Sequence, residues 1–518
     1  MSLKLIKPPK IPAPAIVAEF DGTALAASSL DQNSSPALIK GFLNMLVEAN
    51  LDQIEVEMLI NKVQQATKLS KGILKSKYKQ LSKASGSFLP DQAMTIARSV
   101  LASAFNEGEH LKRSPDGAYW KYTGTHWTET SDHLLKKLLL VEAEATYVPV
   151  GGKGLSAIVS EAKRCLDAES ATDDDVMGFS DDPAPVVNCL NGEVWIDAEG
   201  KPELRQHQPK THLTYCLPIE YDPDASCVLY DSTLLEIFSN AQDPLAMASH
   251  WNEFMGYAIQ PVRDLASFWL LIGHGSNGKT KLVETLQHLL GPDAVLNDQI
   301  SSFQRDRFNA AALVGKLVFI DDDLSENVKL DDGLLKKISE GKEISARHAY
   351  GRRKIAFRSL ALPVLVGNNF PLITDNSHGM VRRAQVIPFE RVFGGDEADP
   401  ALFPAIWNKE LPGILNRALG GLYRLRDRRQ FATPNDCVRA QKEFFINANP
   451  LHAYLDARCI QDSAARLRLQ DMKNWVKDQG IRNAPTDNTL KRKLTGMNFK
   501  ISKVDGRNTV FGLGLKET

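Results

Sequence analysis

The sequence has little of what marks a secreted, membrane-bound or zinc-ribbon protein. It contains six cysteines in 518 residues, and no two of them form a Cys-x-x-Cys pair. Scattered cysteines in a long chain fit a reducing compartment and argue against a zinc ribbon. No apolar run approaches the roughly 18–20 residues of a membrane span, and the N-terminal apolar stretch is too short for a signal peptide. We therefore expect a cytoplasmic protein without membrane contact.

An excess of charge of either sign is also missing. Lys and Arg number 62 against 63 Asp and Glu, which gives a formal net charge of −1. A nucleic-acid partner would therefore have to be held by local basic patches. The chain is too long for one ordinary core, and at roughly 100–200 residues per domain it predicts three or four domains.

Composition and hydrophobic pattern divide the chain into segments with different character. Hairpins are expected at 121–129 and 189–205, where strand-like runs flank turn residues, and a helix is expected over 400–430. The predicted segments are a Pro-, Ala- and Ser-rich leader (1–35), a helical module (36–88), an α/β domain (89–240), a domain that holds the chemistry (241–430) and a C-terminal domain (431–518).

The helical module carries a run of lysines whose role the sequence leaves open. Apolar residues recur every three or four positions over 36–83, which is typical of amphipathic helices. The cluster could belong to a small helix-turn-helix unit that touches DNA, or it could be a solvated helix face. Its members are Lys71, Lys75, Lys77, Lys79 and Lys83.

A phosphate-binding loop is the most specific local signal. The apolar run Phe268–Ile272 precedes Gly-His-Gly-Ser-Asn-Gly-Lys-Thr, which fits the pattern G-x-x-x-x-G-K-[ST]. Glycines let backbone N–H groups curl around phosphate oxygens, and the following helix presents its N-terminus to the anion. Lys279 is expected to neutralise the phosphates of ATP, and Thr280 to help hold Mg²⁺. The predicted nucleotide-binding residues are Gly273, Gly275, Ser276, Asn277, Gly278, Lys279, Thr280 and Lys281.

A second apolar strand, Leu317 to Ile320, leads into Asp321, Asp322 and Asp323. Carboxylates at the carboxyl end of a strand lie where α/β sheets bind their ligands. One can bind Mg²⁺ through water, and another can orient or deprotonate the attacking water. We assign the metal to Thr280 and Asp322, and leave open which acid activates the water.

Polar residues also follow a third apolar stretch. It ends in Asn368-Asn369, and an amide there could hydrogen-bond the γ-phosphate or the lytic water. We favour Asn369 for this role; the alternative is an Asx turn before Pro371. Further on, Arg382 and Arg383 could reach a neighbouring subunit's γ-phosphate or form surface salt bridges.

In order along the chain, five motifs resemble those of the superfamily 3 helicases, in particular the poxvirus and phage-satellite primase–helicases. They are GHGSNGKT, LVFIDDDL, LDDGLLKKISEGKEISAR, VLVGNNFP and VRRAQVIPFE. YTGTHWTE, VVNCLNGEVWI, HLTYCLPIEYDPDA and FMGYAIQ resemble the domain that precedes the motor in that branch, and ELPGILNRALGGLYRL its post-motor helix. The resemblance covers residues 89–518.

The resemblance implies roles for individual residues. Lys279 and Thr280 would bind nucleotide and metal, the paired acids would be Asp321-Asp322 or Asp322-Asp323, and the sensor would be Asn369. The arginine finger would be Arg382 or Arg383. Many relatives also carry an N-terminal primase domain, for which the first 88 residues are too short; we therefore expect no primer synthesis by this chain, and a separate primase.

A DNA-gripping hairpin is also implied by the resemblance, at ARHAYGRRKIAFRS. Cations on phosphates and rings on bases are what single-strand binding requires. The alternative is a solvated hairpin. The basic residues are Arg347, His348, Arg352, Arg353, Lys354 and Arg358, with Tyr350 and Phe357 between them.

The C-terminal tail has a winged-helix pattern: helix, turn, helix and a two-stranded ribbon about Asp505-Gly506. The second helix, Asn488 to Leu494, carries Lys491, Arg492 and Lys493. As a recognition helix it would meet duplex DNA, with the ribbon on the backbone. Docking of a protein partner is the alternative.

These observations predict a multi-domain α/β protein with an AAA+ type motor built on a central parallel sheet. Its expected function is that of an ATP-driven DNA helicase of a phage or other mobile element, acting in the cytoplasm of its host. By resemblance it would form a hexameric ring, move 3′ to 5′ on single-stranded and forked DNA, and cooperate with a primase or polymerase. The alternatives are an origin-melting initiator, a nucleotide-switched scaffold and, more remotely, a small-molecule kinase.

Overall fold

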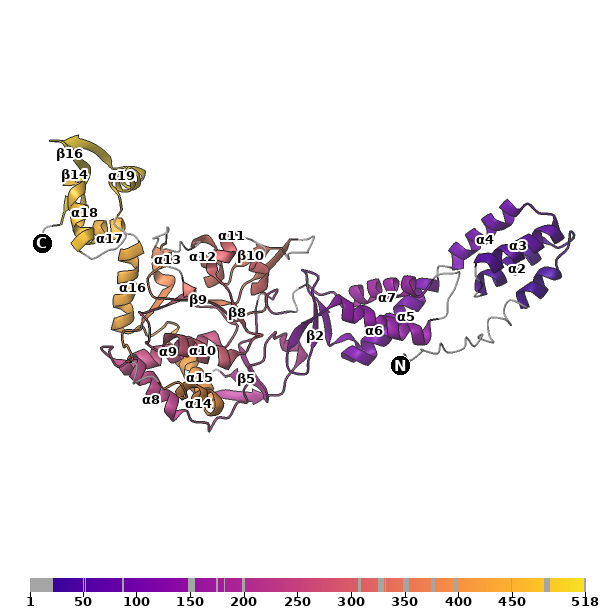
Figure 1. Ribbon diagram of the computed structural model, residues 1–518, viewed down its shortest axis with the longest axis horizontal. Helices are drawn as coiled ribbons and strands as arrows, with labels where there is room; N and C mark the ends of the chain where they lie inside the picture. Colours follow the sequence, from indigo (N-terminus) through magenta and orange to yellow (C-terminus); the bar gives the residue numbers. More distant parts are fainter. Residues whose placement is uncertain are drawn as a thin grey trace, which may run out of the picture. The chain divides into compact units, whose positions relative to one another are not determined.

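The computed structural model divides into two compact units (Figure 1). The boundary between them falls inside 89–240, which the sequence analysis treats as one domain. The first unit comprises Met1–Arg113, Gly117–Lys121 and Glu129–Thr172, and the second Ser114–Asp116, Tyr122–Thr128 and Asp173–Thr518. The residues that the structure describes are 22–49, 51, 53–85, 88–147, 154–173, 176–180, 182–197, 201–305, 309–324, 330, 332–347, 354–373, 378–394, 399–448, 450–478 and 485–516.

The residues that the sequence predicts as a helical module form helices in the first unit. Its helices are α2 (Pro36–Glu48), α3 (Gln53–Thr67) and α4 (Lys71–Ser85). The Ser35 hydroxyl caps α2, and Pro36 opens its first turn, where a missing N–H costs nothing. Lys71 and Lys75 of α4 form ion pairs with Glu57 of α3, at 2.6 and 2.7 Å. Those two lysines therefore hold one helix against the next.

Helices and short strands alternate in the next stretch, as expected. The elements in chain order are α5 (Phe88–Phe105), η1 (Asn106–Gly108), β1 (Leu111–Arg113), β2 (Tyr119–Tyr122), β3 (Trp127–Thr130), α6 (Asp132–Thr146) and α7 (Leu155–Glu169). The apolar faces of α5, α6 and α7 form one core. Lys163 is buried there, and its ammonium donates to the Tyr119 hydroxyl and the Asp167 carboxylate.

A small antiparallel sheet opens the longer continuous stretch of the second unit. It consists of β4 (Val186–Cys189), β5 (Gly192–Ile196) and β6 (Pro202–Arg205), and it confirms the hairpin expected at 189–205. The first turn consists of Leu190 and Asn191, because Gly192 already pairs with Cys189, whereas Glu199-Gly200 lies outside the described residues. The turn η2 (Pro209–Thr211) and the helices α8 (Val228–Ile237) and α9 (Pro244–Ala258) follow.

A parallel five-stranded sheet forms the centre of the second unit. Its strands lie in the order β13-β7-β12-β9-β8. Their bounds are β7 (Phe268–Ile272), β8 (Val295–Asn297), β9 (Val318–Leu324), β12 (Leu362–Gly367) and β13 (Ala384–Pro388). The strand before the phosphate loop is therefore separated from the acidic strand β9 by β12. Parallel strands place all their carboxyl ends at one edge, where the phosphate loop, the acids of β9 and Asn368-Asn369 lie.

Helices and a hairpin fill the connections of this sheet. They are α10 (Lys279–Leu290), α11 (Ile300–Arg305), η3 (Asn309–Leu313), α12 (Asp332–Ser339), β10 (Glu343–Ala346), β11 (Ile355–Arg358) and α13 (His378–Arg383). β10 and β11 pair antiparallel, with Ala346 opposite Ile355 next to the connection. The predicted hairpin is thus confirmed in its two strands.

The helix expected over 400–430 is in fact two helices, α14 (Leu402–Lys409) and α15 (Leu411–Arg428). Pro412 lies in the first turn of α15, where its missing N–H and fixed φ are tolerated, so it starts a new helix. The remaining elements are α16 (Asn435–Ala448), α17 (Pro450–Arg458), β14 (Cys459–Arg468), α18 (Leu469–Asp478), α19 (Asp487–Gly496), β15 (Lys500–Val504) and β16 (Arg507–Leu515).

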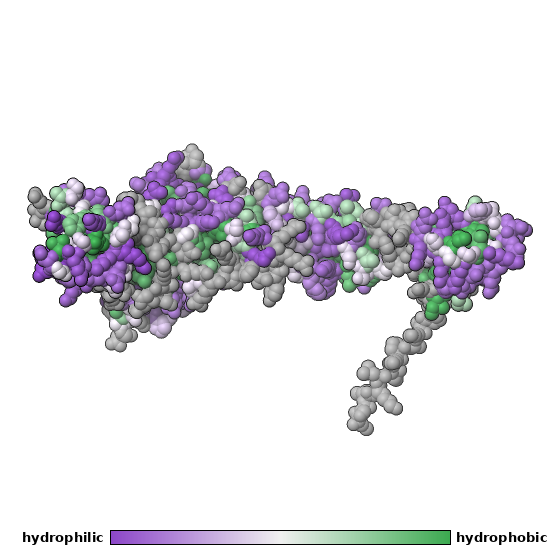
Figure 2. Space-filling model, turned by 90° about the horizontal axis from the view of Figure 1, so that it is seen from above, coloured by the Kyte–Doolittle hydropathy of each residue, from purple (hydrophilic) through white to green (hydrophobic). Residues whose placement is uncertain are grey.

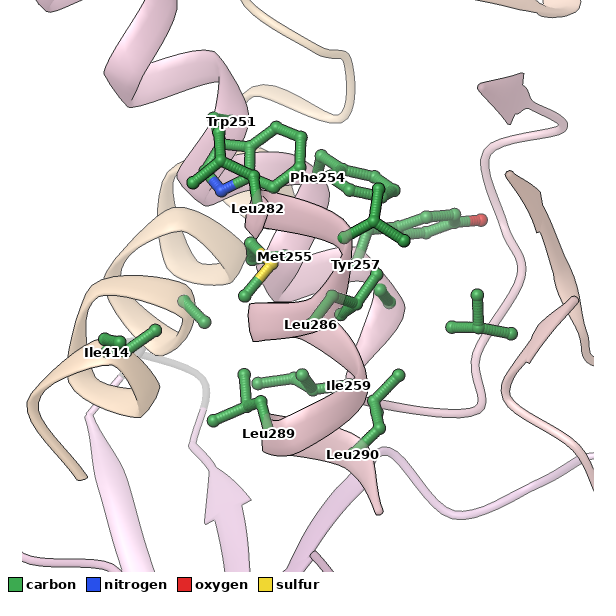
Figure 3. Close-up of a cluster of buried hydrophobic side chains, with 14 of the residues drawn as sticks. Trp251, Phe254, Met255, Tyr257, Ile259, Leu282, Leu286, Leu289, Leu290 and Ile414 are labelled. Atoms are coloured by element: carbon green, nitrogen blue, oxygen red, sulfur yellow. The ribbon is translucent and has the colours of Figure 1, made fainter. Parts of the chain in front are cut away.

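The helix after the phosphate loop is held rigidly by its apolar face. Figure 3 shows Leu282, Leu286 and Leu289 of α10 pointing toward side chains of α9 and toward Ile414 of α15. Each of these three leucines is fully buried. At about 1.5–3 kcal/mol per buried leucine, this packing fixes the N-terminus of α10 beneath the loop.

Among the residues coloured by hydropathy in Figure 2, hydrophilic ones cover most of the visible surface. Among the residues that the structure describes, none forms a helix long and apolar enough to cross a membrane.

Candidate active site

The phosphate loop lies at the carboxyl edge of the parallel sheet. β7 ends at Ile272, which pairs with Gly367 at the end of β12 and with Pro388 at the end of β13. The loop follows directly as residues 273–278, and α10 starts at Lys279. The strand thus has the bounds that the sequence predicts, and the last two residues of the motif, Lys279 and Thr280, already belong to the helix, whose N-terminus faces the loop.

A close backbone approach explains one of the glycines, and a positive φ explains another. A Cβ atom on Gly273 would lie 2.4 Å from the Phe389 carbonyl oxygen, and Gly278 has a φ of +77°. Ser276 has a φ of +57°, which is unusual for a residue with a side chain. The buried Asn277 amide donates to the His274 carbonyl at 2.8 Å and so fixes the loop's curl.

Lys279 connects the loop to the strand tip beside it. Its ammonium donates to the Gly273 carbonyl at 2.7 Å and to the Asn368 side-chain oxygen at 3.3 Å. Burial lowers the pKa of Lys279. The amide that reaches the loop lysine is thus that of Asn368, whereas the sequence favoured Asn369. Asn369 makes other contacts and is half-buried.

The three aspartates differ sharply in environment. β9 continues through them to Leu324, so Asp321 lies within the strand, opposite Leu365 of β12. Asp321 is 4% exposed, and its carboxylate accepts the Ile300 N–H at 2.8 Å, at the start of α11. Burial raises its pKa, opposed by backbone hydrogen bonds. Asp322 and Asp323 are exposed and lie nearer the carboxyl edge.

Thr280 and Lys281 lie in the first turn of α10 and have different surroundings. Thr280 is exposed in the first turn of α10. Lys281 forms an ion pair with Glu284 at 2.7 Å, and its ammonium lies 5.4 Å from the centre of the Trp407 ring. Those contacts tie Lys281 to the flank of α10 and to α14.

A segment that the sequence analysis missed lies against the loop. The N–H of Phe393 donates to the Ser276 carbonyl at 2.8 Å, and the Asn277 amide donates to the Phe389 carbonyl at 3.3 Å. The segment follows β13, so it starts at the same sheet edge as the loop. Only the order of the strands in the sheet, which the sequence does not show, places this segment beside the loop.

The two arginines have different surroundings at the opposite edge of the sheet. Arg383 is largely buried and forms an ion pair with Glu340. Arg382 is exposed, and no hydrogen bond or ion pair joins it to another residue in the described part of the chain. Ala384 follows them and pairs with Phe268, the first residue of β7. The strand β7 therefore separates these arginines from the phosphate loop.

The predicted DNA-contact residues are described only in part. In the hairpin, Arg347 and Lys354 are exposed at the ends of β10 and β11, while His348, Arg352 and Arg353 lie outside the described residues. Arg358 is tied to the Gly341 carbonyl at 2.9 Å.

The C-terminal residues form the two helices and the ribbon that the sequence predicts, with one added strand. α18 and α19 precede the ribbon of β15 and β16, which turns at Asp505-Gly506; β14 is a third strand, paired with β16. Arg492 and Lys493 are exposed on α19, and Lys491 is half-buried.

Comparisons with known proteins relate parts of the chain to helicase-related proteins. Residues 99–239 match the family described as D5 N terminal like, and residues 271–383 match a family of unknown function, DUF5906. A protein of Acanthamoeba polyphaga mimivirus, provisionally named helicase L207/L206, is 32% identical over 129 residues. That match covers 24% of this chain and 13% of the mimivirus protein.

Solved structures of the NrS-1 C-terminal region align with most of the chain. One apo structure covers 81% of this chain and 98% of its own, with a TM-score of 0.45 and 12% identity. A second, of residues 305–718 of that protein, covers 80% of this chain and 98% of its own, with a TM-score of 0.40 and 12% identity.

Proposed function

We propose that the chain is an ATP-driven DNA motor of the superfamily 3, AAA+ type. The observation that carries the proposal is the gathering of Lys279, Asn368 and the acids of β9 at one sheet edge, with a hairpin inserted between β9 and β12. The strand order β13-β7-β12-β9-β8 supports the AAA+ assignment. The name of the mimivirus protein, helicase, supports the activity.

The loop fits a bound phosphate group. A Cβ on Gly275 would meet nothing within 4 Å, so the loop has open space in front of it, and backbone N–H groups can approach an anion there. Lys279 would neutralise the phosphates, and Thr280 with Asp322 would hold Mg²⁺, which supplies charge stabilisation when bound. Asn368 would orient the γ-phosphate or the attacking water, and an exposed acid at the end of β9 would accept its proton.

Turnover would then require a second subunit, because Arg382 lies at the far edge of its own sheet. In a ring, the arginine of one subunit would reach the nucleotide of the next. Hydrolysis would move the basic hairpins along one DNA strand, in the 3′ to 5′ direction. A primase or polymerase from elsewhere would complete the replication machinery.

The test is the ATPase rate with and without single-stranded DNA, at stated salt, for the wild type and Lys279→Ala. Strong stimulation by DNA, lost in the variant, is the expected result, followed by strand displacement on forked substrates. ATP turnover that DNA does not change would refute the motor.

A second candidate is an origin-melting initiator, which the winged-helix-like C-terminal domain favours. Arg492 and Lys493 are exposed on α19, the helix that would enter a major groove. The two functions differ in processivity. An initiator would melt a blunt duplex that contains its binding sequence and stop, whereas a helicase would displace long strands from any fork.

A further inference from the structure

A cavity of about 340 Å³ lies beside the small antiparallel sheet of the second unit, outside the candidate active site. Ligand pockets commonly have volumes of about 300–1,000 Å³, so one nucleotide would fit. Trp195 and Arg205 from β5 and β6 form one wall, and Gln208, Lys210 and Thr211 of the following turn form another.

One buried carboxylate holds both walls. Glu193 is fully buried, and its side chain accepts hydrogen bonds from the Gln208 N–H at 3.0 Å and from the Thr211 hydroxyl at 2.7 Å. Its other oxygen accepts the Trp195 indole N–H at 3.1 Å. The ring and the turn are therefore fixed relative to one another before any ligand arrives.

The lining groups match the parts of a nucleotide. The Arg205 guanidinium lies over the Trp195 ring, 5.0 Å from its centre, and nucleobases stack on both kinds of surface. The Gln208 amide offers a donor and an acceptor to a base edge, and the exposed Lys210 offers a cation to a phosphate. Asp182 also lines the cavity, and its carboxylate can accept an N–H of a base edge.

The cavity is joined to the base of the basic hairpin. Met177 lines the cavity, and its neighbour Gly178 accepts the N–H of Arg358, the last residue of β11, at 2.7 Å. The centre of the ring of Phe179, the residue after Gly178, lies 6.5 Å from that of Phe357 in β11. Arg358 is four residues from Lys354, or roughly 13 Å of strand. A single DNA strand held by the hairpin could therefore reach the cavity within a few nucleotides.

We propose that this cavity binds one nucleotide of single-stranded DNA, with its base on Trp195 and Arg205 and its phosphate on Lys210. It would extend the DNA path from the hairpin onto the domain before the motor. The proposal rests on the proposed function, because the DNA strand would reach the cavity from the hairpin of the motor.

The test uses the full chain and an oligothymidine that carries 5-iododeoxyuridine, crosslinked by ultraviolet light and mapped by peptide mass. The expected crosslink is on the peptide that contains Trp195, competed by unlabelled single-stranded DNA but not by ATP. Trp195→Ala should weaken binding of a short oligonucleotide roughly 5- to 100-fold, while Trp195→Phe retains most of the affinity.

A charge-reversal pair provides the matched control. Lys210→Glu should weaken DNA binding and lower the slope of log affinity against log salt by about 1. Lys201→Glu makes the same charge change directly before β6, outside the cavity. It should leave the DNA affinity and the salt slope unchanged. Equal effects of the two variants would overturn the proposal, since both residues are exposed and neither change disturbs a core.

The outcomes separate this proposal from the proposed function. Crosslinks confined to other peptides, with ATPase activity still stimulated by DNA, would overturn the cavity and leave the motor intact. Labelling of the cavity by a photoreactive ATP analogue instead of DNA would also overturn it. If the wild-type protein neither bound DNA nor showed DNA-stimulated ATP turnover, the proposed motor function itself would be refuted.

Discussion

Replacement of Arg382 by alanine should abolish ATP turnover without unfolding the protein, and the defect should be rescued by a neighbouring subunit. Arg382 is exposed and precedes Ala384, which pairs with the first residue of β7. β7 is five residues long, so at about 3.3 Å per residue the loop lies roughly 15 Å further on. An arginine side chain cannot span that distance within its own subunit.

The size of the expected effect differs between the two arginines. An arginine finger contributes about 10³- to 10⁵-fold to turnover, so Arg382→Ala should lower the ATPase rate by at least ~10³-fold. Arg383 is only 11% exposed on its side chain and pairs with Glu340. Removing one partner of a buried pair costs about 3–5 kcal/mol, so Arg383→Ala should mainly destabilise the fold. We expect the lower end, because Lys342 also pairs with Glu340.

Mixing two inactive variants provides the assay. Lys279→Ala subunits keep Arg382, and Arg382→Ala subunits keep Lys279. If each interface joins the loop of one subunit to the arginine of the next, a 1:1 mixture restores about a quarter of the interfaces. The ATPase rate of the mixture should therefore exceed that of either variant alone. A wild-type rate for Arg382→Ala, or a mixture as inactive as its components, would refute the reasoning.

Three further results are expected, two at the phosphate loop and one in the core beside it. Asn368→Ala should lower kcat for ATP about 10²-fold and Asn369→Ala should not, since Asn368 meets Lys279; equal steady-state rates would contradict this. Gly273→Ala should weaken binding of a fluorescent ATP analogue, because its Cβ would collide with the Phe389 carbonyl, whereas Gly41→Ala in α2, where a Cβ meets nothing within 4 Å, should bind normally. Burial lowers the pKa of His250 to about 3. As the pH falls, the His250 imidazole is therefore protonated first in the unfolded chain. Its contribution to the stability of the fold is fully present above about pH 6.5 and is lost progressively toward pH 3. His250→Phe should remove about 2 kcal/mol of the destabilisation between pH 7 and 5, measured by urea unfolding.

The sequence predicts the elements around the phosphate loop because local patterns determine them. An apolar run, a glycine loop and a helix with leucines on one face need no distant partner, and β7 and α10 lie where the pattern predicts. The cavity beside β5 could not be predicted in this way. Trp195 and Lys210 are brought together by Glu193, whose hydrogen bonds cross from a strand to a turn. Nothing in the linear pattern distinguishes that glutamate from a solvated one.

The same limit explains the choice among Asp321, Asp322 and Asp323. The family resemblance leaves two choices for the paired acids, because three identical residues in a row give no landmark. The structure distinguishes them by burial: Asp321 accepts the Ile300 N–H inside the sheet, and the other two face solvent. A carboxylate already engaged with a backbone donor is suited to positioning α11. We infer that water activation is left to Asp322 or Asp323.

The opposed edges of the sheet also restrict how subunits can assemble. If Arg382 completes a neighbour's site, the amino edge of one sheet must face the carboxyl edge of the next. Such a contact joins two different surfaces, so it is heterologous and cannot form a closed two-fold dimer. Repetition gives a ring when the rotation between subunits closes, and a helical filament when it does not. An isolated pair would have one complete site and one incomplete site. ATP turnover per subunit should therefore rise with assembly, because each added subunit completes a site that a monomer cannot complete by itself.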